Sequence, residues 1–219
     1  MLVLAIDTSS PAVTAGVVTV GGDVAPAAER TALAPRGHGE LLAPSIAGCL
    51  DDLGVAPADL AAVVVGTGPG PYTGLRVGMV TAATFADALG IPVYGVGSLD
   101  ALGASCADEP SLLVATDARR REVYWARYEH GRRVTEPAVA RPGDVPLDGV
   151  TAVAGAGGEL YADAWPQLAR RLERYPDPLA LVRLARDRIV AGAPTETLNP
   201  LYLRRPDAVV PGAPKTVTQ

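Results

Sequence analysis

The spacing of apolar residues along this chain predicts a series of buried strands at its start. Continuous runs of aliphatic and β-branched residues at 2–7, 12–20 and 59–66 are typical of strands inside a sheet. Another strand is expected at 24–33, and the turn sequences TSSP and GGD separate the first three strands. These three strands are therefore expected to form a meander.

Two later segments change to the three- and four-residue spacing of an amphipathic helix. They are 38–54 and 74–90, and each ends on a glycine, the residue that most often terminates a helix. A strand at 91–97 and a helix at 98–107, capped by Ser98, follow them. The first unit is therefore predicted to have the order βββαβαβα.

A second unit is expected to begin near Glu109 and to open with strands as well. Residues 111–134 predict two long strands around a tight turn, and 150–158 predict a strand that leads into a glycine loop. Two more amphipathic helices are expected at 161–173 and 178–192.

This order predicts an α/β protein made of two related halves. The halves are expected at 1–108 and 109–198, with part of 199–219 completing the first. A chain of 219 residues that is 48% hydrophobic and 20% charged has enough apolar residues for such cores.

Charge and composition exclude several classes of function. The net charge of −5 argues against a protein that holds nucleic acid mainly by its own charge. The N-terminus lacks the basic start of a signal peptide, and the apolar runs are shorter than a membrane span. We therefore expect a soluble, cytoplasmic protein with no membrane contact.

The glycine-rich run GTGPGPYTGLRVG at 66–78 has two interpretations. A loop between a strand and a helix can bind phosphate through free N–H groups. However, Leu75 and Arg76 follow Gly74 where a Walker A loop has lysine, and Thr73 occupies the third glycine position of GxGxxG. A sharp packing turn, with Thr73 capping the next helix, is therefore favoured.

The sequence AIDTSS at 5–10 places a carboxylate, Asp7, at the end of a buried strand. Nucleotide-dependent enzymes use such an aspartate to orient a metal-bound water. The alternative is that Asp7 caps a turn, and the motif alone favours this alternative.

Metal ligands and nucleophiles are few. His38 would need a second histidine four residues later, where Leu42 stands, so no metal site is expected. Cys49 lies on the apolar stripe of its helix, and Cys106 has no histidine near it in sequence. No catalytic constellation can be assembled from these residues.

Arginines are concentrated in and around the expected hairpin of the second unit, at positions 119–121, 127, 132 and 133. A solvated turn and a contact with a polyanion are the two readings of this concentration, and the turn is favoured.

Four motifs together resemble the TsaB (YeaZ) family: LAIDTSS, GTGPGPYTGLRVG, DARRREVYWARY and NPLYLR, in this order over essentially the whole chain. The residues that carry the resemblance are Gly68, Gly70, Thr73, Gly74, Arg76, Asp117 and Arg119. The resemblance implies the fold of the actin/sugar-kinase/Hsp70 superfamily (ASKHA), with two βββαβαβα-type halves facing a cleft.

The resemblance also implies a function. Members of this family are partner proteins in forming threonylcarbamoyladenosine (t6A) at adenosine 37 of tRNAs that read ANN codons. The related protein TsaD carries the metal and performs the transfer, and the ATPase TsaE completes the set. Contact with tRNA would be indirect, through this complex.

Departures from the catalytic pattern imply a retired active site. Ser9 stands where superfamily ATPases have glycine in DxGT, so Asp7, Thr8 and Ser9 would form a degenerate nucleotide site. Only His38 remains of the catalytic relative's two metal-binding histidines. We therefore expect a non-catalytic scaffold without a cofactor, with ATP or ADP binding at the partner interface left open. The alternatives are an active kinase or acyltransferase, which would close Asp7 and residues 155–158 on a phosphate, and a metallopeptidase.

The family's partner contact uses two helices of the first half, here 38–54 and 74–90. The TsaD-like subunit is expected to bind this face, which would pair with itself as a homodimer in isolation. The expected contact residues are Leu42, Ile46, Leu75, Gly78, Met79, Ala82, Ala83 and Ala86.

Overall fold

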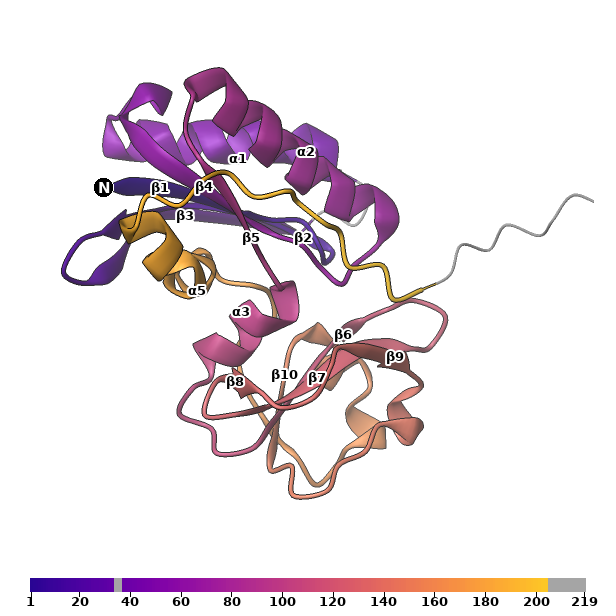
Figure 1. The fold of residues 1–219 in the computed structure, drawn as a ribbon. Coiled ribbons are helices and arrows are strands. Elements are labelled where there is room, and N and C mark those ends of the chain that lie inside the picture. The colour runs from indigo at the N-terminus through magenta and orange to yellow at the C-terminus, as the bar shows by residue number, and fades with distance from the viewer. Residues whose placement is uncertain (34–36, 205–219) are drawn as a thin grey trace, which may run out of the picture.

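The computed structural model describes residues 1–33 and 37–204, which form two lobes, each built around one β-sheet (Figure 1). The sheet of the first lobe has the order β3-β2-β1-β4-β5. Its strands are β1 (Leu2–Asp7), β2 (Ala12–Val20), β3 (Val24–Leu33), β4 (Leu60–Gly66) and β5 (Val93–Val96). The predicted strands of the first half are thus confirmed.

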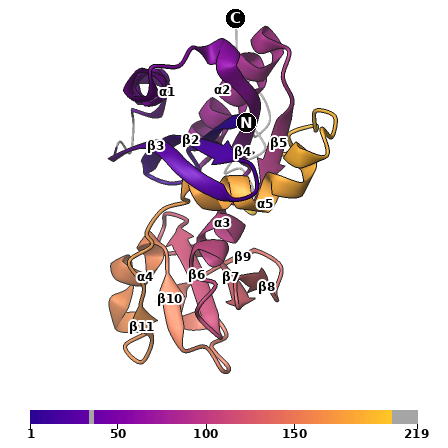
Figure 2. The same ribbon diagram turned by 90° about the vertical axis from the view of Figure 1, so that its left-hand side faces the viewer.

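Helices cover both faces of this sheet. Alternate side chains of β1 point to opposite faces. Leu4 and Ile6 pack under α1 (His38–Leu53) and α2 (Tyr72–Leu89), whereas Val3 and Ala5 pack on α5 (Pro178–Val190). Figure 2 shows α1 and α2 on the side of the sheet away from the second lobe.

The predicted ends of the first two helices are confirmed. Gly54 and Gly90 adopt left-handed backbone conformations with φ of 64° and 66°. An L side chain rarely adopts this conformation, so glycine closes each helix at low cost.

The second lobe repeats this strand order with shorter elements. Its sheet runs β11-β10-β6-β7-β8, and β9 also pairs with β7. The strands are β6 (Leu112–Asp117), β7 (Val123–Glu129), β8 (Arg132–Arg133), β9 (Ala138–Ala140), β10 (Ala152–Ala154) and β11 (Ala169–Arg170). The helical elements are α3 (Ser98–Ser105), α4 (Ala156–Leu160) and short 3-10 turns at Pro142–Asp144 and Ala162–Ala164; a third such turn, Pro57–Asp59, precedes β4 in the first lobe.

The central strand has equivalent neighbours in both lobes. β1 pairs antiparallel with β2 and parallel with β4, and β6 pairs antiparallel with β7 and parallel with β10. The outer strands β5 and β11 continue each sheet in parallel. Two lobes of equivalent topology are the arrangement expected of the ASKHA fold.

The lobes exchange helices. Helix α3 precedes residue 108 but packs Leu99 and Leu102 against the second sheet, while α5 packs Leu181 and Val182 against the first. A division into 1–108 and 109–198 therefore does not separate the two cores, because the chain crosses between the lobes more than once. Of the segment 199–219, residues 205–219 lie outside the described part of the chain.

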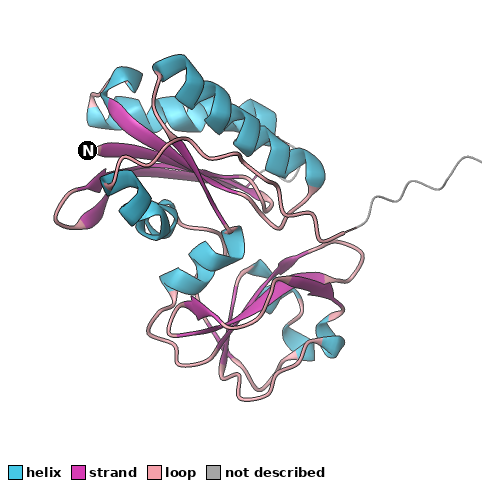
Figure 3. Cartoon of the chain, in the orientation of Figure 1, coloured by secondary structure: helices cyan, strands magenta, loops and turns pink. Residues whose placement is uncertain are grey.

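The predicted helix at 161–173 is wrong. The chain there forms the turn Ala162–Ala164 and the short strand β11, and Figure 3 shows mostly loops around it. Pro166 disfavours helical geometry at the preceding residue, Trp165. The buried Trp165 indole donates a 2.9 Å hydrogen bond to the Pro142 carbonyl oxygen, which fixes the loop instead.

The chain after α5 returns along the first lobe as an extended segment (yellow in Figure 1). Its backbone pairs with β5 and with the loop that follows β4: Glu196 N–H donates to Val93 O at 3.0 Å, and Leu201 N–H donates to Thr67 O at 2.9 Å. We call residues 196–204 the strap.

Candidate functional site

Asp7 lies at the end of β1 and is fully buried, with 0% of its surface exposed. One carboxylate oxygen accepts hydrogen bonds from Ser9 N–H at 2.9 Å and Ser9 Oγ at 2.7 Å. The other oxygen accepts a 2.6 Å bond from Ser98 Oγ. Burial raises the pKa of Asp7, and these hydrogen bonds partly oppose that shift. The carboxylate therefore fixes the turn after β1, as the turn interpretation predicted.

Ser98 does not cap α3 as predicted. The residue before α3 is Gly97, and the Ser98 hydroxyl, besides donating to Asp7, accepts a 3.1 Å bond from Gly68 N–H. Because α3 packs on the second sheet, Ser98 ties the glycine-rich loop and β1 to the start of the second lobe. The buried partner Asp7 attracts this hydroxyl more strongly than a helix end does.

The glycines of the signature run pack against the turn after β1. A Cβ at Gly66 would collide with the Asp7 carboxylate, and one at Gly70 with the Ser9 backbone. A Cβ at Gly74 would lie 2.8 Å from the Thr8 carbonyl oxygen. The packing-turn interpretation of the run is thus confirmed for these glycines, which allow the loop and α2 to approach closely.

Thr8 is also held by this helix. Its hydroxyl donates to Gly74 O at 2.7 Å and accepts from Gly78 N–H at 3.0 Å. Thr73 was predicted to cap this helix, but the capping residue is Pro71. Thr73 lies within the first turn of α2 and is exposed. Asp7, Thr8 and Ser9, which the sequence predicted as a degenerate nucleotide site, are therefore brought together with Gly74, and their polar groups bond to one another and to the loop.

A hollow of about 400 Å³ lies between this turn and the second lobe. His38 borders it and bonds through Nε2 to the Ser10 carbonyl oxygen at 2.7 Å. The second lobe contributes Arg119 from the β6–β7 hairpin. The hollow thus joins the first and third family motifs, which the sequence alone could not place side by side.

The hairpin that carries Arg119 has an unusual backbone. Arg119, Arg120 and Arg121 have φ values of 63°, 53° and 62°, a conformation that costs non-glycine residues roughly 1–2 kcal/mol each. Asp117 stabilises the turn, because its carboxylate accepts the Arg119 N–H at 2.9 Å. The predicted hairpin is confirmed, and a polyanion contact through these arginines stays a prediction.

Most of the predicted partner-binding residues belong to the core, which corrects their assignment. All of them except Ala83 are buried, and the apolar stripes of α1 and α2 pack against the first sheet. The buried residues are Leu42, Ile46, Leu75, Gly78, Met79, Ala82 and Ala86. A helix that lies on a sheet buries its apolar stripe there, so only its opposite face is accessible.

The outward face of the two helices carries small and apolar side chains. Ala43, Pro44 and Ala47 are exposed on α1, and Ala83 is exposed on α2. Val80 on α2 is 63% exposed. We call these five residues the outward face.

An aromatic cluster adjoins the outward face at the start of α2. The rings of Tyr72 and Tyr202 stack with centroids 5.3 Å apart, and the Arg76 guanidinium lies 4.1 Å from the Tyr72 ring centroid. Arg76 Nε also donates to Tyr202 Oη at 2.9 Å. The tyrosines are 57% and 38% exposed. Sequence reasoning named Arg76 but missed both tyrosines, although each stands inside a family motif.

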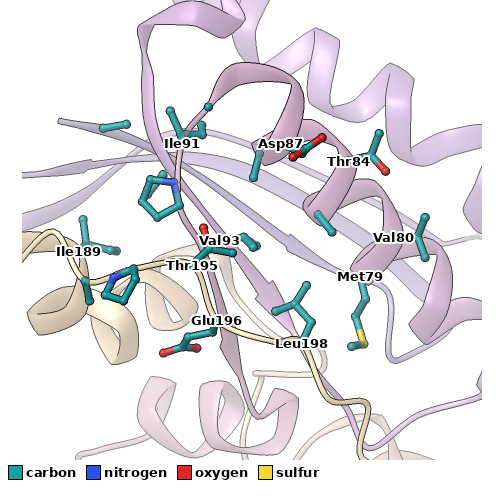
Figure 4. A pocket seen from close by; sticks show the side chains of 18 of the residues that line it. Met79, Val80, Thr84, Asp87, Ile91, Val93, Ile189, Thr195, Glu196 and Leu198 are labelled. Atoms are coloured by element: carbon teal, nitrogen blue, oxygen red, sulfur yellow. The ribbon is translucent and has the colours of Figure 1, made fainter.

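A groove of about 1240 Å³ lies beside this cluster, between the C-terminal half of α2, β5 and the chain around 189–200. Figure 4 shows Met79, Val80 and Leu198 along it, with Asp87 and Glu196 as acidic residues. The groove continues the apolar surface that begins at Val80.

Neither a metal cluster nor a membrane helix is found among the described residues. Within 1–33 and 37–204, no three His, Cys, Asp or Glu side chains come together as metal ligands. None of the helices in the same ranges has the length and hydropathy that a membrane crossing requires.

A protein-family model matches most of this chain. The family described as "TsaD: tRNA N6-adenosine threonylcarbamoyltransferase" matches residues 29–199 of this chain.

Similar proteins cover the same range. An uncharacterized protein of Mycobacterium leprae is 50% identical over 208 residues, 94% of this chain, although the chain spans only 56% of that protein's length. The tRNA threonylcarbamoyladenosine biosynthesis protein TsaB of Escherichia coli is 29% identical over 230 residues, covering 93% of this chain and 95% of that protein.

A solved structure has the same fold. YeaZ from Pseudomonas aeruginosa superposes with a TM-score of 0.76 at 29% identity, over 92% of this chain and 99% of that one. The superposition includes both lobes, as does the sequence alignment with the E. coli protein. The chain belongs to the TsaB (YeaZ) family.

Proposed function

We propose that this protein takes part in forming threonylcarbamoyladenosine at adenosine 37 of tRNA, as the non-catalytic partner of a TsaD-like subunit. The E. coli relative, which aligns over nearly the full length of both chains, is named for this biosynthesis. The family match and the two-lobed fold support the same assignment.

The state of Asp7 carries the non-catalytic part of this proposal. A carboxylate that orients a metal-bound water must present a free oxygen to the cleft. Here both oxygens of Asp7 accept hydrogen bonds within the protein, and the side chain is fully buried. Ser9 adds a side chain where a phosphate would need close backbone approach.

The kinase or acyltransferase alternative has little support in the second lobe. Residues 155–158 would have to offer their backbone to a phosphate. Instead, a Cβ at Gly157 would lie 2.8 Å from the Ala115 carbonyl oxygen, so this loop packs on the neighbouring strand β6. The metallopeptidase alternative lacks a ligand set, since His38 bonds to a backbone carbonyl and Leu42 is buried in the core.

The TsaD-like subunit is proposed to bind the outward face of α1 and α2. Small residues such as Ala43, Ala47 and Ala83 let another helix approach closely, and Val80 adds apolar area. Because the TsaD family matches this chain, a TsaD-like protein has a related helix pair, and the two pairs can pack as one layer. A second copy of this chain has the same face, which accounts for the proposed homodimer in isolation.

Other members of the complex are proposed on weaker grounds. A TsaE-like ATPase would join the assembled pair, and tRNA would contact it through the TsaD-like subunit. ATP or ADP at the interface is a further proposal, and it would require groups from both proteins. The soluble complex would work in the cytoplasm.

The interface is tested by co-purifying this chain with the TsaD-like protein of the same organism. Val80→Glu and Ala47→Glu would bury an uncompensated charge in the contact, so we expect each to abolish co-purification. Leu160→Glu is the matched control, because Leu160 is 59% exposed on the second lobe. Normal binding by both interface variants, with cooperative melting, would rule out this face.

The catalytic part is tested by reconstitution. The purified chain alone should neither transfer threonylcarbamoyl to tRNA nor hydrolyse ATP steadily. Asp7→Asn should leave the activity of the reconstituted complex largely intact when the variant is folded. Steady ATP turnover by the isolated chain that Asp7→Asn removes would support the kinase-like alternative instead.

A further inference from the structure

The strap is bound to the first lobe along most of its length. Beyond its two backbone hydrogen bonds, the Glu196 carboxylate pairs with Arg188 at 2.8 Å and accepts the Gly95 N–H at 3.1 Å. Leu198 packs against the core beneath α1 and α2. These contacts hold residues 196–201 to the edge of the first sheet.

The end of the strap is bound to the second lobe. Arg204 Nη1 donates a 2.8 Å hydrogen bond to the Ala118 carbonyl oxygen, and Nη2 lies 3.1 Å from the Glu122 carboxylate. Leu203 packs against the cluster between α3 and the second sheet. A single extended segment therefore contacts both lobes within a few residues.

The Arg204 contact lies on the β6–β7 hairpin, apart from the place where the chain itself joins the lobes. Ala101 of α3 packs with α5 and the first sheet, and Ser98 bonds to Asp7, so the covalent connections lie near α3 and α5. In Figure 1 the strap reaches the second lobe at the far end of the β6–β7 hairpin. Two lobes that are connected at one side can rotate about that side as a hinge, and a separate contact at another side limits this rotation.

We propose that the strap is a conformational catch: it sets the closure of the two lobes, and Arg204 fastens it to the β6–β7 hairpin. Releasing Arg204 lets the lobes rotate about the α3–α5 side and widens the hollow between His38 and Arg119. The Arg204 end of this device is held by short-range polar contacts, which exchange more readily than a packed core.

The catch also links lobe closure to the surface at the start of α2. Tyr202 lies within the strap and stacks on Tyr72, while Arg76 bonds to its hydroxyl. Release of the strap therefore moves Tyr202 away from Tyr72 and Arg76, and it also separates the lobes. Any partner that covers this cluster holds the strap in place and thereby favours the closed arrangement.

The test measures the distance between the lobes in the full-length chain alone, so it is independent of the proposed role in tRNA modification. Spin labels are attached at Asp51→Cys on α1 and Leu160→Cys on the second lobe, both exposed positions. Cys49 and Cys106 are buried, and burial raises the pKa of the Cys106 thiol to about 12, so neither competes for the label. Pulsed electron resonance then gives the distance distribution.

Arg204→Ala is compared with Arg174→Ala, which removes a similar ion pair, to Glu159, within the second lobe. We expect Arg204→Ala to broaden the distribution about twofold toward longer distances, and Arg174→Ala to leave it unchanged. Exchanging the charges, Arg204→Glu with Glu122→Arg, should recover much of the narrow distribution.

Unchanged distances in Arg204→Ala would overturn the proposal, as would equal broadening in the Arg174→Ala control. Thermal melting checks that each variant folds. If Arg204→Ala does not melt cooperatively, Glu122→Gln repeats the comparison, because it removes only the charge that faces Arg204, and an unchanged distribution there overturns the proposal equally.

Discussion

The two lobes have the same strand order but cover their sheets differently. The first sheet is enclosed by α1 and α2 on one face and by α5 on the other. One face of the second sheet packs on α3, but the other is covered by the short helix α4 and by loops that contribute Trp165, Leu168 and Val145. The two lobes therefore share the strand order of their sheets but differ in the helices and loops that pack on those sheets.

The close packing of glycine is common to both lobes. Gly70 approaches the end of β1 in the first lobe, and Gly155 and Gly157 approach Ala115 of β6 in the second. In each case a loop after a parallel strand lies against the central strand. In both lobes the protein's own backbone occupies the space next to these glycines.

The two lobes differ in the surface that they offer to a partner. Long helices give the first lobe an outward surface of regular, small side chains that is independent of its core. The second lobe has no equivalent surface among its described residues, because α4 is a short helix of five residues. Four experiments test these differences between the lobes.

The largest effect is expected from Ala82→Glu, compared with Ala83→Glu. Ala82 lies on the face of α2 that packs on the sheet and is 0% exposed. The substitution therefore buries an unpaired carboxylate and should lower the free energy of unfolding by more than about 3 kcal/mol. Ala83 is exposed, so its variant should melt close to the wild type while losing the partner. Similar melting temperatures for both variants would show that the core and outward faces of α2 have been confused.

The glycine contacts are expected to matter equally in both lobes. Gly74→Ala and Gly157→Ala each place a Cβ 2.8 Å from a carbonyl oxygen, which should destabilise the protein by about 1–3 kcal/mol. Gly39→Ala is the control, since no atom lies within 4 Å of the new Cβ on α1. Urea unfolding gives the free energy of unfolding of the three variants. If Gly157→Ala is as stable as the wild type, the glycine contacts of the two lobes are not equivalent.

Asp7→Asn should have a smaller and pH-dependent effect, of about 1–2 kcal/mol. Burial raises the folded-state pKa of Asp7, so its contribution to stability is present below the unfolded pKa and is lost as pH rises through the folded value. The substitution removes this titration. Unfolding free energies should therefore differ more between wild type and Asp7→Asn at pH 4 than at pH 7, and the opposite trend would contradict a raised pKa.

The smallest effect on stability is expected for Tyr202→Ala, less than about 1 kcal/mol, because the ring stacks on Tyr72 at the surface. Partner affinity should fall more than stability does, since exposed tyrosine and arginine are typical of binding surfaces. Calorimetric titration with the TsaD-like protein gives the affinity. If Tyr202→Ala binds the TsaD-like protein with unchanged affinity, the aromatic cluster is not part of the interface, which then comprises the outward face alone.

The sequence predicted the first lobe well because its helices and strands have clear periods and glycine ends. It could not decide which face of α2 meets a partner, because the stripe through Leu75, Met79 and Ala82 fits a core and an interface equally well. Trp165 and Pro166 were misread, since apolar spacing outweighed the effect of proline. Arg76 and Tyr202 are 126 residues apart in sequence, so no local pattern could have joined them.

The exchange of α3 and α5 has a consequence for how the protein is made. While the chain is being synthesised, all five strands of the first sheet leave the ribosome long before residues 178–190 do. Until then, one face of that sheet, including Val3, Ala5 and Val64, is covered only in part, because α3 contributes Ala101 and α5 is missing. The N-terminal lobe must therefore wait for nearly the whole chain before it is complete, and an interrupted chain presents an apolar sheet to the chaperones of the cell.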